Sequence, residues 1–266
     1  MSQSSESFCL NDKFKEWACS YSGCDGGDFK SKIWLCGIEW GFSKDRDKTE
    51  EQYQAVLADF YSRELPEEIS RGAYTPKDSQ YNVAEAWKYQ YGQKVAKLYA
   101  AIKGQEVSQA WDFAQRCNGT EIFRLNLYPI AFPNEWDGLW DEHKLKDVTG
   151  LESKQIYRTW CFLHRLPWIA EQVKQHKPKL IIGTGVRYLT DFIICFGGLG
   201  MAEHIHQETI TAPSESTGTT SRNMYWAKVG EMTTLVVTPF LGSVHGLNSD
   251  ALLQAFGKRI SEIVEF

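Results

Sequence analysis

A chain of 266 residues with 14% aromatic side chains and 10 tryptophans can bury one large core, and this composition excludes extended disorder. The net charge of −5 gives no overall attraction to nucleic acid, so any DNA binding must use a local basic face. No run of about 18 apolar residues is present, so the sequence predicts no membrane span.

The organisation that we expect is a single domain over residues 30–266, with an N-terminal segment, 1–29, that packs on it or leads into it. The first seven residues are polar and lack the apolar stretch of a secretion signal. Seven cysteines with no CxxC pair then predict free thiols in a cytoplasmic protein. The closest pair, Cys19 and Cys24, is better explained by packing than by an iron–sulfur cluster, so we expect no metal and no cofactor.

Residues 33–42 form the most informative stretch of the chain. Their apolar start predicts a buried strand of a parallel sheet at 33–37. Gly37 and Gly41 allow a sharp turn at its carboxyl end, which is the edge where ligands bind in open α/β sheets. Glu39, beside Trp40, is therefore expected at the rim of a crevice. The alternative is a surface turn in which Glu39 only caps the next helix.

The rest of the first half is expected to hold two helices and a second strand. In chain order the patterns predict a helix at 53–61, a long polar loop at 66–82, a helix from Trp87 to Ile102 that stops at Gly104, and a strand at 121–128. Asn126 lies near the end of that second strand.

The second half continues the alternation of strands and helices. It predicts a loop at 129–150, helical spacing from Ile156 with a fresh turn at Pro167, a strand at 180–185, a helix through Phe192, a flexible loop at 211–221, hairpin strands at 224–229 and 234–238, and a final helix from about Ser249. The sequence therefore predicts an α/β fold, in which helices flank both faces of a central, mostly parallel sheet that carries long loop insertions.

Three polar groups fall at strand ends that a parallel sheet would bring together: Glu39, Asn126 and the loop that carries His245. An amide can read the edge of a nucleobase, because it offers a donor and an acceptor side by side. A carboxylate can orient water or stabilise an oxocarbenium-like sugar, and a histidine can stabilise charge on a departing base. Each residue alone has an ordinary structural explanation.

Together and in this order, these residues resemble the motifs of the uracil-DNA glycosylase superfamily. Gly37-Ile-Glu-Trp-Gly41 looks like its first motif, and Arg124-Leu-Asn-Leu-Tyr128 is similar to the strand whose asparagine reads uracil. Residues 180–185 look like its third, structural strand, and residues 238–243 occupy the place of its His-Pro-Ser loop. The resemblance implies a glycosylase-like α/β fold and a monofunctional enzyme that flips a base out of duplex DNA and hydrolyses its N-glycosidic bond.

The chain also departs from the pattern of that superfamily. Glu39 stands where Asp or Asn is common, Trp40 replaces a proline, and Phe240 takes the histidine position, so that His245 is the nearest imidazole. The cysteines do not follow the spacing of the iron–sulfur branches. A rearranged pocket predicts a bulkier modified pyrimidine as substrate. One branch of the superfamily acts on hypermodified cytosine in phage DNA, as a defence.

The resemblance assigns candidate roles along the chain. Catalytic roles fall on Glu39 and His245. Base-binding roles fall on Asn126, Trp40, Gly37 and Phe240. Contacts to DNA fall on Lys44, Arg46, Lys48, Leu241, Ser243 and Leu247, with Leu241 or Leu247 as an exposed wedge that replaces the flipped base. The expected partner is double-stranded DNA, including phage DNA, and the sequence does not indicate an oligomeric state.

Two other functions remain open at this point. The chain could be a non-catalytic module that only recognises modified DNA, and formation of abasic sites separates this function from a glycosylase. It could instead be a nucleoside- or nucleotide-processing α/β enzyme with a phosphate at Gly183-Thr-Gly185, although no GxxxxGKS motif is near. Activity on free nucleosides would favour the latter.

Overall fold

The central feature is one six-stranded sheet. The computed structural model describes residues 9–21, 24–39, 90–110, 121–130, 132 and 135–266. In the order β2-β1-β3-β6-β5-β4, the strands are β2 (Phe123–Asn126), β1 (Ile33–Gly37), β3 (Leu180–Thr184), β6 (Thr233–Thr238), β5 (Gly218–Val229) and β4 (His206–Ser214). The first four are parallel, and β5 and β4 extend the sheet antiparallel. The predicted α/β fold with a mostly parallel sheet is confirmed.

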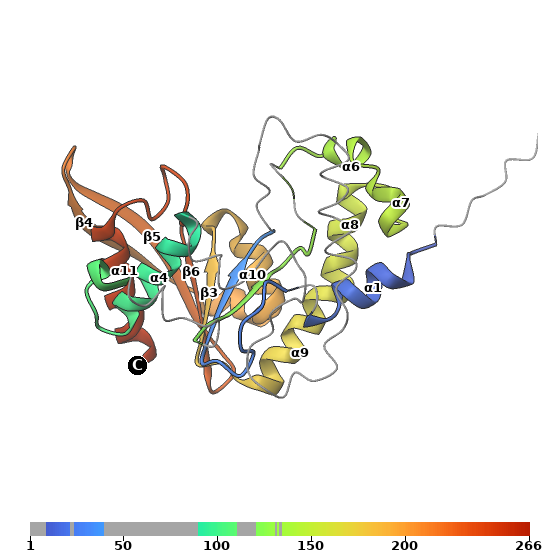
Figure 1. Cartoon of the computed structure of the whole chain (residues 1–266). Helices are drawn as coiled ribbons and strands as arrows, with labels where there is room; N and C mark the ends of the chain where they lie inside the picture. The colour runs from blue at the N-terminus through green and yellow to red at the C-terminus, as the bar shows by residue number, and fades with distance from the viewer. Residues whose placement is uncertain (1–8, 22–23, 40–89, 111–120, 131, 133–134) are drawn as a thin grey trace, which may run out of the picture.

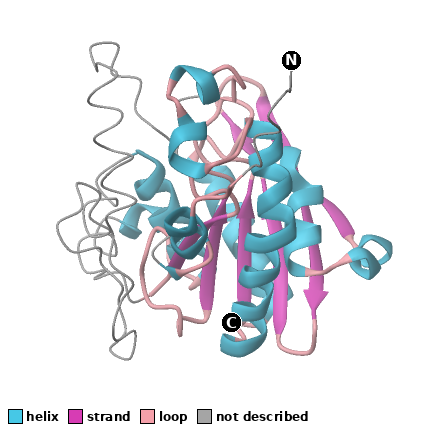
Figure 2. Cartoon of the chain, turned by 90° about the vertical axis from the view of Figure 1, so that its right-hand side faces the viewer, coloured by secondary structure: helices cyan, strands magenta, loops and turns pink. Residues whose placement is uncertain are grey.

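Helices cover both faces of this sheet. They are α1 (Asp12–Ala18), α4 (Gln90–Ile102), α6 (Leu139–Glu142), α7 (Leu145–Thr149), α8 (Lys154–Trp160), α9 (Leu166–His176), α10 (Leu189–Phe196) and α11 (Asp250–Val264). Helices α4 and α11 lie on one side of the sheet, and α1, α8, α9 and α10 lie on the other (Figure 1). Figure 2 shows the strands running side by side between these layers.

The apolar strand sequences follow from burial on both faces. In β1, Ile33 and Leu35 pack into the core beneath α4 and α11, while Trp34 and Cys36 pack into the opposite core. A strand with a core on each side must be apolar at every position, which explains the uninterrupted run. In the register, Gly37 pairs with Asn126, so the ends of β1 and β2 meet at the carboxyl edge of the sheet, as the sequence predicts.

The N-terminal segment contributes to the same core. Phe14 and Trp17 of α1 are buried, and the backbone N–H of Asn11 donates to the carbonyl oxygen of Thr149 at 3.0 Å. Further along, Gly26 forms an antiparallel bridge with Arg124, next to the edge strand β2. The segment before β1 is therefore integrated with the domain.

The predicted loop at 129–150 is wrong in part, because it contains the short helices α6 and α7. Leu139, Trp140 and Leu145 are buried there. Helices this short are not stable alone, so the packing of these apolar side chains stabilises them. The helix predicted at 53–61 and the loop predicted at 66–82 lie outside the described residues.

The flexible loop predicted at 211–221 is also wrong. This stretch belongs to the β4–β5 hairpin, which turns at residues 215–217. Threonine is β-branched and suits a strand. Polar side chains also pair across the hairpin, since Thr209 donates to Asn223 at 3.0 Å and the hydroxyls of Thr211 and Ser221 lie 2.8 Å apart. Cross-strand pairs therefore order a composition that resembles a loop.

Pro167 does not interrupt the helix that contains it. Helix α8 continues through a π-helical turn, Cys161–Arg165, directly into α9. Proline lacks an N–H and its ring clashes with the carbonyl four residues earlier in a regular α-helix. The wider π turn before Pro167 relieves that conflict, so the helical backbone continues through the proline rather than ending there.

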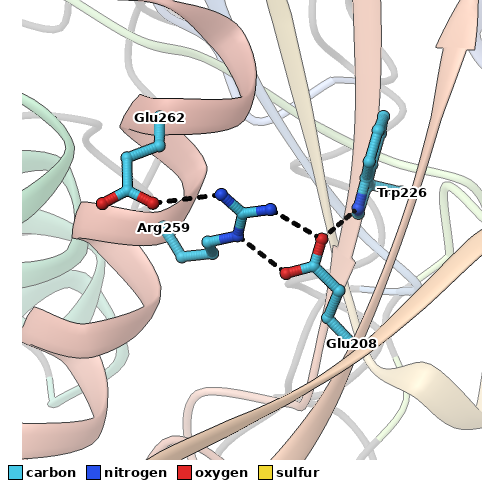
Figure 3. Close-up of polar contacts among 4 residues, drawn as sticks. All are labelled: Glu208, Trp226, Arg259 and Glu262. Carbon is cyan, nitrogen blue, oxygen red and sulfur yellow. Dashed lines mark hydrogen bonds and ion pairs between the residues drawn. The ribbon is translucent and has the colours of Figure 1, made fainter.

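An ion-pair network attaches the β4–β5 hairpin to α11 (Figure 3). Arg259 donates to both carboxylate oxygens of Glu208, at 2.7 and 2.9 Å, and to Glu262 at 3.0 Å. The indole N–H of Trp226 also donates to Glu208, at 2.9 Å. The hydrogen bonds from Arg259 lower the pKa of Glu208 below its ordinary value.

We expect Glu208→Gln to lower the free energy of unfolding by about 0.5–1 kcal/mol at neutral pH. Because the folded pKa is depressed, the contribution of Glu208 is present above its unfolded pKa and is lost as the pH falls through the folded pKa. Urea unfolding should therefore separate the variant from the wild type at about pH 7 and not at about pH 3. Glu262→Gln, which removes a single contact to Arg259, is the control and should have a smaller effect. Equal unfolding curves at both pH values would show that the network does not stabilise the fold.

Neither a membrane-spanning helix nor a cluster of metal ligands is found in the described part of the chain. None of its helices has both the length and the apolar character needed to cross a bilayer. Cys9, Cys19, Cys24, Cys36, Cys161 and Cys195 carry free thiols. Within the same residues, no group of three or more His, Cys, Asp or Glu side chains is placed to hold a metal ion.

Candidate active site

Gly37 and Asn126 are in direct contact at the carboxyl edge of the sheet. A side chain at position 37 would collide with Oδ1 of Asn126. The sequence indicates a glycine needed for a turn, whereas the structure shows a glycine that makes room for the amide. Asn126 itself is 4% exposed. The predicted juxtaposition of the first two strand ends is therefore present, with the amide packed against the backbone of β1.

We expect Gly37→Ala to displace the Asn126 side chain. The added methyl group overlaps Oδ1, and overpacking of this kind costs about 1–3 kcal/mol of stability. Base release, if Asn126 reads the base, should fall at least about tenfold. Chemical unfolding and single-turnover kinetics measure the two effects. Gly200→Ala is the control, since nothing lies within 4 Å of the added methyl group. Wild-type turnover in Gly37→Ala would mean that the position of the amide does not matter.

Glu39 lies just beyond β1 with its side chain half-buried. Its Oε2 atom is buried and has no hydrogen-bond partner among the described residues. Burial raises the pKa of Glu39 to about 7, against the opposing effect of the positive charges of Lys154 and Arg158. Glu39 is therefore a carboxyl group that can gain or lose a proton near neutral pH, and perturbed groups of this kind cluster at functional sites.

Lys154 and Arg158 of α8 are site residues that the sequence analysis missed. Lys154 is 1% exposed, its Nζ has no hydrogen-bond partner in the described part of the chain, and it lies 3.9 Å from the centroid of the Phe132 ring. Arg158 lies 5.5 Å from the centroid of Tyr128, and its Nε is buried without a hydrogen bond to any described residue. Burial lowers the pKa of Lys154. The spacing of Lys154 and Arg158 could have identified them in the sequence, because cations four residues apart share one face of a helix.

Asn126 is held from its side chain and from its backbone. Its Nδ2 donates to Oδ1 of Asp25 at 2.6 Å. Arg165, which is fully buried in the π-helical turn, donates to the carbonyl oxygens of Asn126 at 2.7 Å and Leu127 at 2.9 Å, and also to that of Ala18. The sequence analysis also missed both Asp25 and Arg165. They fix the end of β2 and with it the amide.

An aromatic pair lies at the same edge of the sheet. The exposed ring of Phe240 stacks on Tyr91, with centroids 5.7 Å apart and ring planes at 26°. The hydroxyl groups of Tyr91 and Thr184, at the end of β3, lie 3.1 Å apart. The Arg124 guanidinium is 5.9 Å from the Tyr91 centroid. Phe240 therefore presents a flat apolar surface near the strand ends, as a base-stacking role requires.

The loop 240–248 differs from its prediction. Leu241 and Leu247 are fully buried, so the expectation of an exposed leucine wedge is wrong. The N–H of Leu247 donates to the carbonyl oxygen of Phe240 at 3.1 Å, which folds the loop back and directs both leucines into the core. Val244, 76% exposed, is the most exposed apolar side chain of this loop. Ser243 and His245 are exposed, as their predicted roles require.

Arg222 of β5 supports this loop from the hairpin. Its guanidinium donates to the carbonyl oxygens of Gly246 and Val244, each at 3.3 Å. Trp40, Lys44, Arg46 and Lys48, which the sequence analysis assigned to base and phosphate contacts, lie outside the described residues. These four assignments remain predictions.

A cavity of about 600 Å³ lies elsewhere, at the opposite edge of the sheet. Its lining includes Val173, Phe196 and the β5–β6 turn at 230–232. The residues that line it include neither Glu39 nor Asn126, and none of the residues described above as contacting them. We place the candidate site at the carboxyl edge, because the unpartnered buried polar atoms of Glu39, Lys154 and Arg158 are there.

The chain was compared with protein-family models, with curated proteins and with solved structures, and none of the three comparisons gave a match. The resemblance to uracil-DNA glycosylases therefore rests on the motifs alone.

Proposed function

We propose that this chain is a monofunctional DNA glycosylase, with a glycosylase-like version of the α/β fold. It would flip a modified pyrimidine out of duplex DNA and hydrolyse its N-glycosidic bond, leaving an abasic site. The observation that carries the proposal is Glu39, a half-buried carboxyl with an unpartnered oxygen and a pKa near neutrality. In its ionised form it can orient the attacking water or stabilise positive charge on the sugar.

The other groups at this edge divide the remaining tasks. Asn126 would hydrogen-bond to the flipped base, and Phe240 would stack on it. His245, exposed on the loop 240–248, would stabilise negative charge on the departing base. Val244 replaces the two leucines as the candidate wedge, because it is the most exposed apolar side chain of that loop.

The site supports an enzyme over a module that only binds DNA. A buried carboxyl oxygen without a partner lowers stability, and a surface that only recognises DNA does not need one. The structure also gives the glycines of the alternative phosphate site, Gly183 and Gly185, roles in packing and hydrogen bonding within the sheet. Gly183 packs in β3 against the Phe192 ring, and the N–H of Gly185 donates to the carbonyl oxygen of Thr238 at 2.8 Å. That N–H is therefore not available to a phosphate.

The proposed substrate is a bulky modified pyrimidine, such as those of phage DNA, and the role that we propose with it is antiviral defence. The His-Pro-Ser triplet of uracil-selective enzymes is absent, and Glu39 is one methylene longer than aspartate. A base with a polar adduct needs a larger pocket with several hydrogen-bond partners. We therefore expect weak or no release of plain uracil.

A screen of duplex substrates tests this function. The full-length protein is incubated with duplexes that carry uracil, hydroxymethyluracil, hydroxymethylcytosine or glucosylated hydroxymethylcytosine, and abasic sites are detected by alkaline cleavage. The proposal predicts cleavage at a modified pyrimidine at a rate well above that at uracil. Tight DNA binding without cleavage would support the binding module, and release of bases from free nucleosides alone would support the nucleoside-processing enzyme.

A further inference from the structure

Asp25 lies in the segment before β1, beside the end of β2. Its neighbour Gly26 is tied to Arg124 by two backbone hydrogen bonds of 3.2 and 2.8 Å. The Asp25 side chain is buried, and its Oδ2 lies 3.7 Å from the Arg124 guanidinium. The backbone bridge and the ion pair with Arg124 together hold the Asp25 carboxylate next to Asn126.

This carboxylate determines which way the Asn126 amide points. Nδ2 of Asn126 lies 2.6 Å from Oδ1 of Asp25. An ionised carboxylate accepts hydrogen bonds and cannot donate them, so only the amide NH₂ can face it. The amide oxygen is then directed to the side of Gly37, where the missing side chain leaves room for it. Among the described residues, none donates a hydrogen bond to that oxygen.

We propose that Asp25 is a specificity-determining residue. It accepts a hydrogen bond from the NH₂ group of the Asn126 amide and leaves the amide oxygen to accept from the flipped base. This inference rests on the proposed glycosylase function of the same site. An exocyclic amino group on the base can donate to the amide oxygen. We infer that the amide oxygen faces this exocyclic group rather than the ring N–H of a keto base. A carbonyl oxygen at the exocyclic position would place two acceptors opposite each other, and a site built around a hydrogen bond discriminates strongly against such an analogue. Asp25 therefore favours an aminopyrimidine over its keto counterpart.

An asparagine without this neighbour would not discriminate in the same way. A free amide can turn by half a rotation about its last side-chain bond and present either its NH₂ or its oxygen. Asp25 removes one of the two orientations, because the turned amide would place its oxygen against the carboxylate. The specificity of Asn126 therefore depends on a residue 101 positions earlier in the chain.

The test compares hydroxymethylcytosine with hydroxymethyluracil, which differ in whether ring position four carries an amino group or an oxygen. We expect the wild-type protein to prefer the amino substrate in single-turnover kcat/KM. In Asp25→Asn, the new amide can donate to the oxygen of Asn126, so both orientations of Asn126 become accessible. The preference should fall at least about tenfold. Asp28→Asn, a carboxylate change three residues away, is the control and should keep the wild-type ratio.

A double variant separates orientation from folding. Asp25→Asn with Asn126→Asp keeps the hydrogen bond with donor and acceptor exchanged, and it still presents an acceptor to the base. It should restore the preference for the amino substrate to within about threefold of the wild type. A wild-type ratio in Asp25→Asn, a wild-type preference for the keto base, or no restoration in the double variant would each overturn the role of Asp25 while leaving the glycosylase in place. Wild-type protein that releases no base from any duplex would overturn the proposed function, and this inference with it.

Discussion

Glu39→Gln should bind modified duplex DNA like the wild type and yet release the base at least about 100-fold more slowly. Glutamine keeps the size and polarity of the side chain but cannot carry the negative charge that orients water or stabilises the sugar cation. Single-turnover base release measures the chemical step, and fluorescence anisotropy measures binding. Glu142→Gln, on an exposed position at the end of α6, is the control. Wild-type turnover in Glu39→Gln would remove Glu39 from the mechanism.

The raised pKa of Glu39 gives this variant a second signature. The groups that act on it are Lys154 and Arg158, which favour its charged form, and Glu135 and Asp137, which oppose it. Since the ionised form is the active one, wild-type turnover should rise with pH through about 7. The pKa of Glu39 in the folded protein lies above its ordinary value of 4.5. The contribution of Glu39 to stability therefore falls as the pH rises from 4.5 to about 7. Glu39→Gln should therefore be more stable than the wild type by about 1–3 kcal/mol at pH about 8, with no gain at pH about 4.

Arg165→Met should have the largest effect on stability. The guanidinium is fully buried and donates to backbone carbonyl oxygens of Asn126, Leu127 and Ala18. Methionine fills similar space but leaves these acceptors without their donor, and each unsatisfied buried group costs about 1–3 kcal/mol. We expect a loss of about 3 kcal/mol or more in the free energy of unfolding, measured by urea denaturation.

The same change should also disturb the site, because Arg165 holds the end of β2. Variant protein that is still folded should release base more slowly, with turnover affected more than DNA binding. Lys174→Met, on the exposed side of α9, is the matched control and should stay within about 0.5 kcal/mol of the wild type. If Arg165→Met unfolds like the wild type, the backbone carbonyl oxygens that Arg165 contacts must accept hydrogen bonds from other donors in the variant.

The sequence predicted those parts of the fold that depend on local patterns. Apolar runs at 33–36 and 180–182 indicated strands buried on both faces, and both are central strands of the sheet. The final helix was expected from about Ser249, and Ser249 is its N-cap residue, whose hydroxyl accepts from the N–H of Leu252 at 3.2 Å. Strand patterns and cap residues are encoded within a few positions, so they can be read without tertiary contacts.

The sequence analysis failed where long-range packing decides the outcome. No local pattern shows that Leu241 and Leu247 turn inward, because loops with glycines can direct a leucine either way. The partnership of Asp25 with Asn126 spans 101 positions, and Arg165 reaches the end of β2 from a π-helical turn that no local pattern indicated. Glu39 was identified from its place after a strand, whereas the unpartnered state of its oxygen became visible only with the surrounding atoms.

The most direct test of the central claim is to measure the free base and the abasic DNA together. Purified protein is incubated with duplexes that carry a modified pyrimidine, and mass spectrometry identifies the small-molecule product while alkaline cleavage counts the abasic sites. The proposed function predicts one intact free base for each abasic site, with both products absent or strongly reduced for Glu39→Gln. Bound duplex that yields neither product, or a product that still carries its sugar, would contradict it.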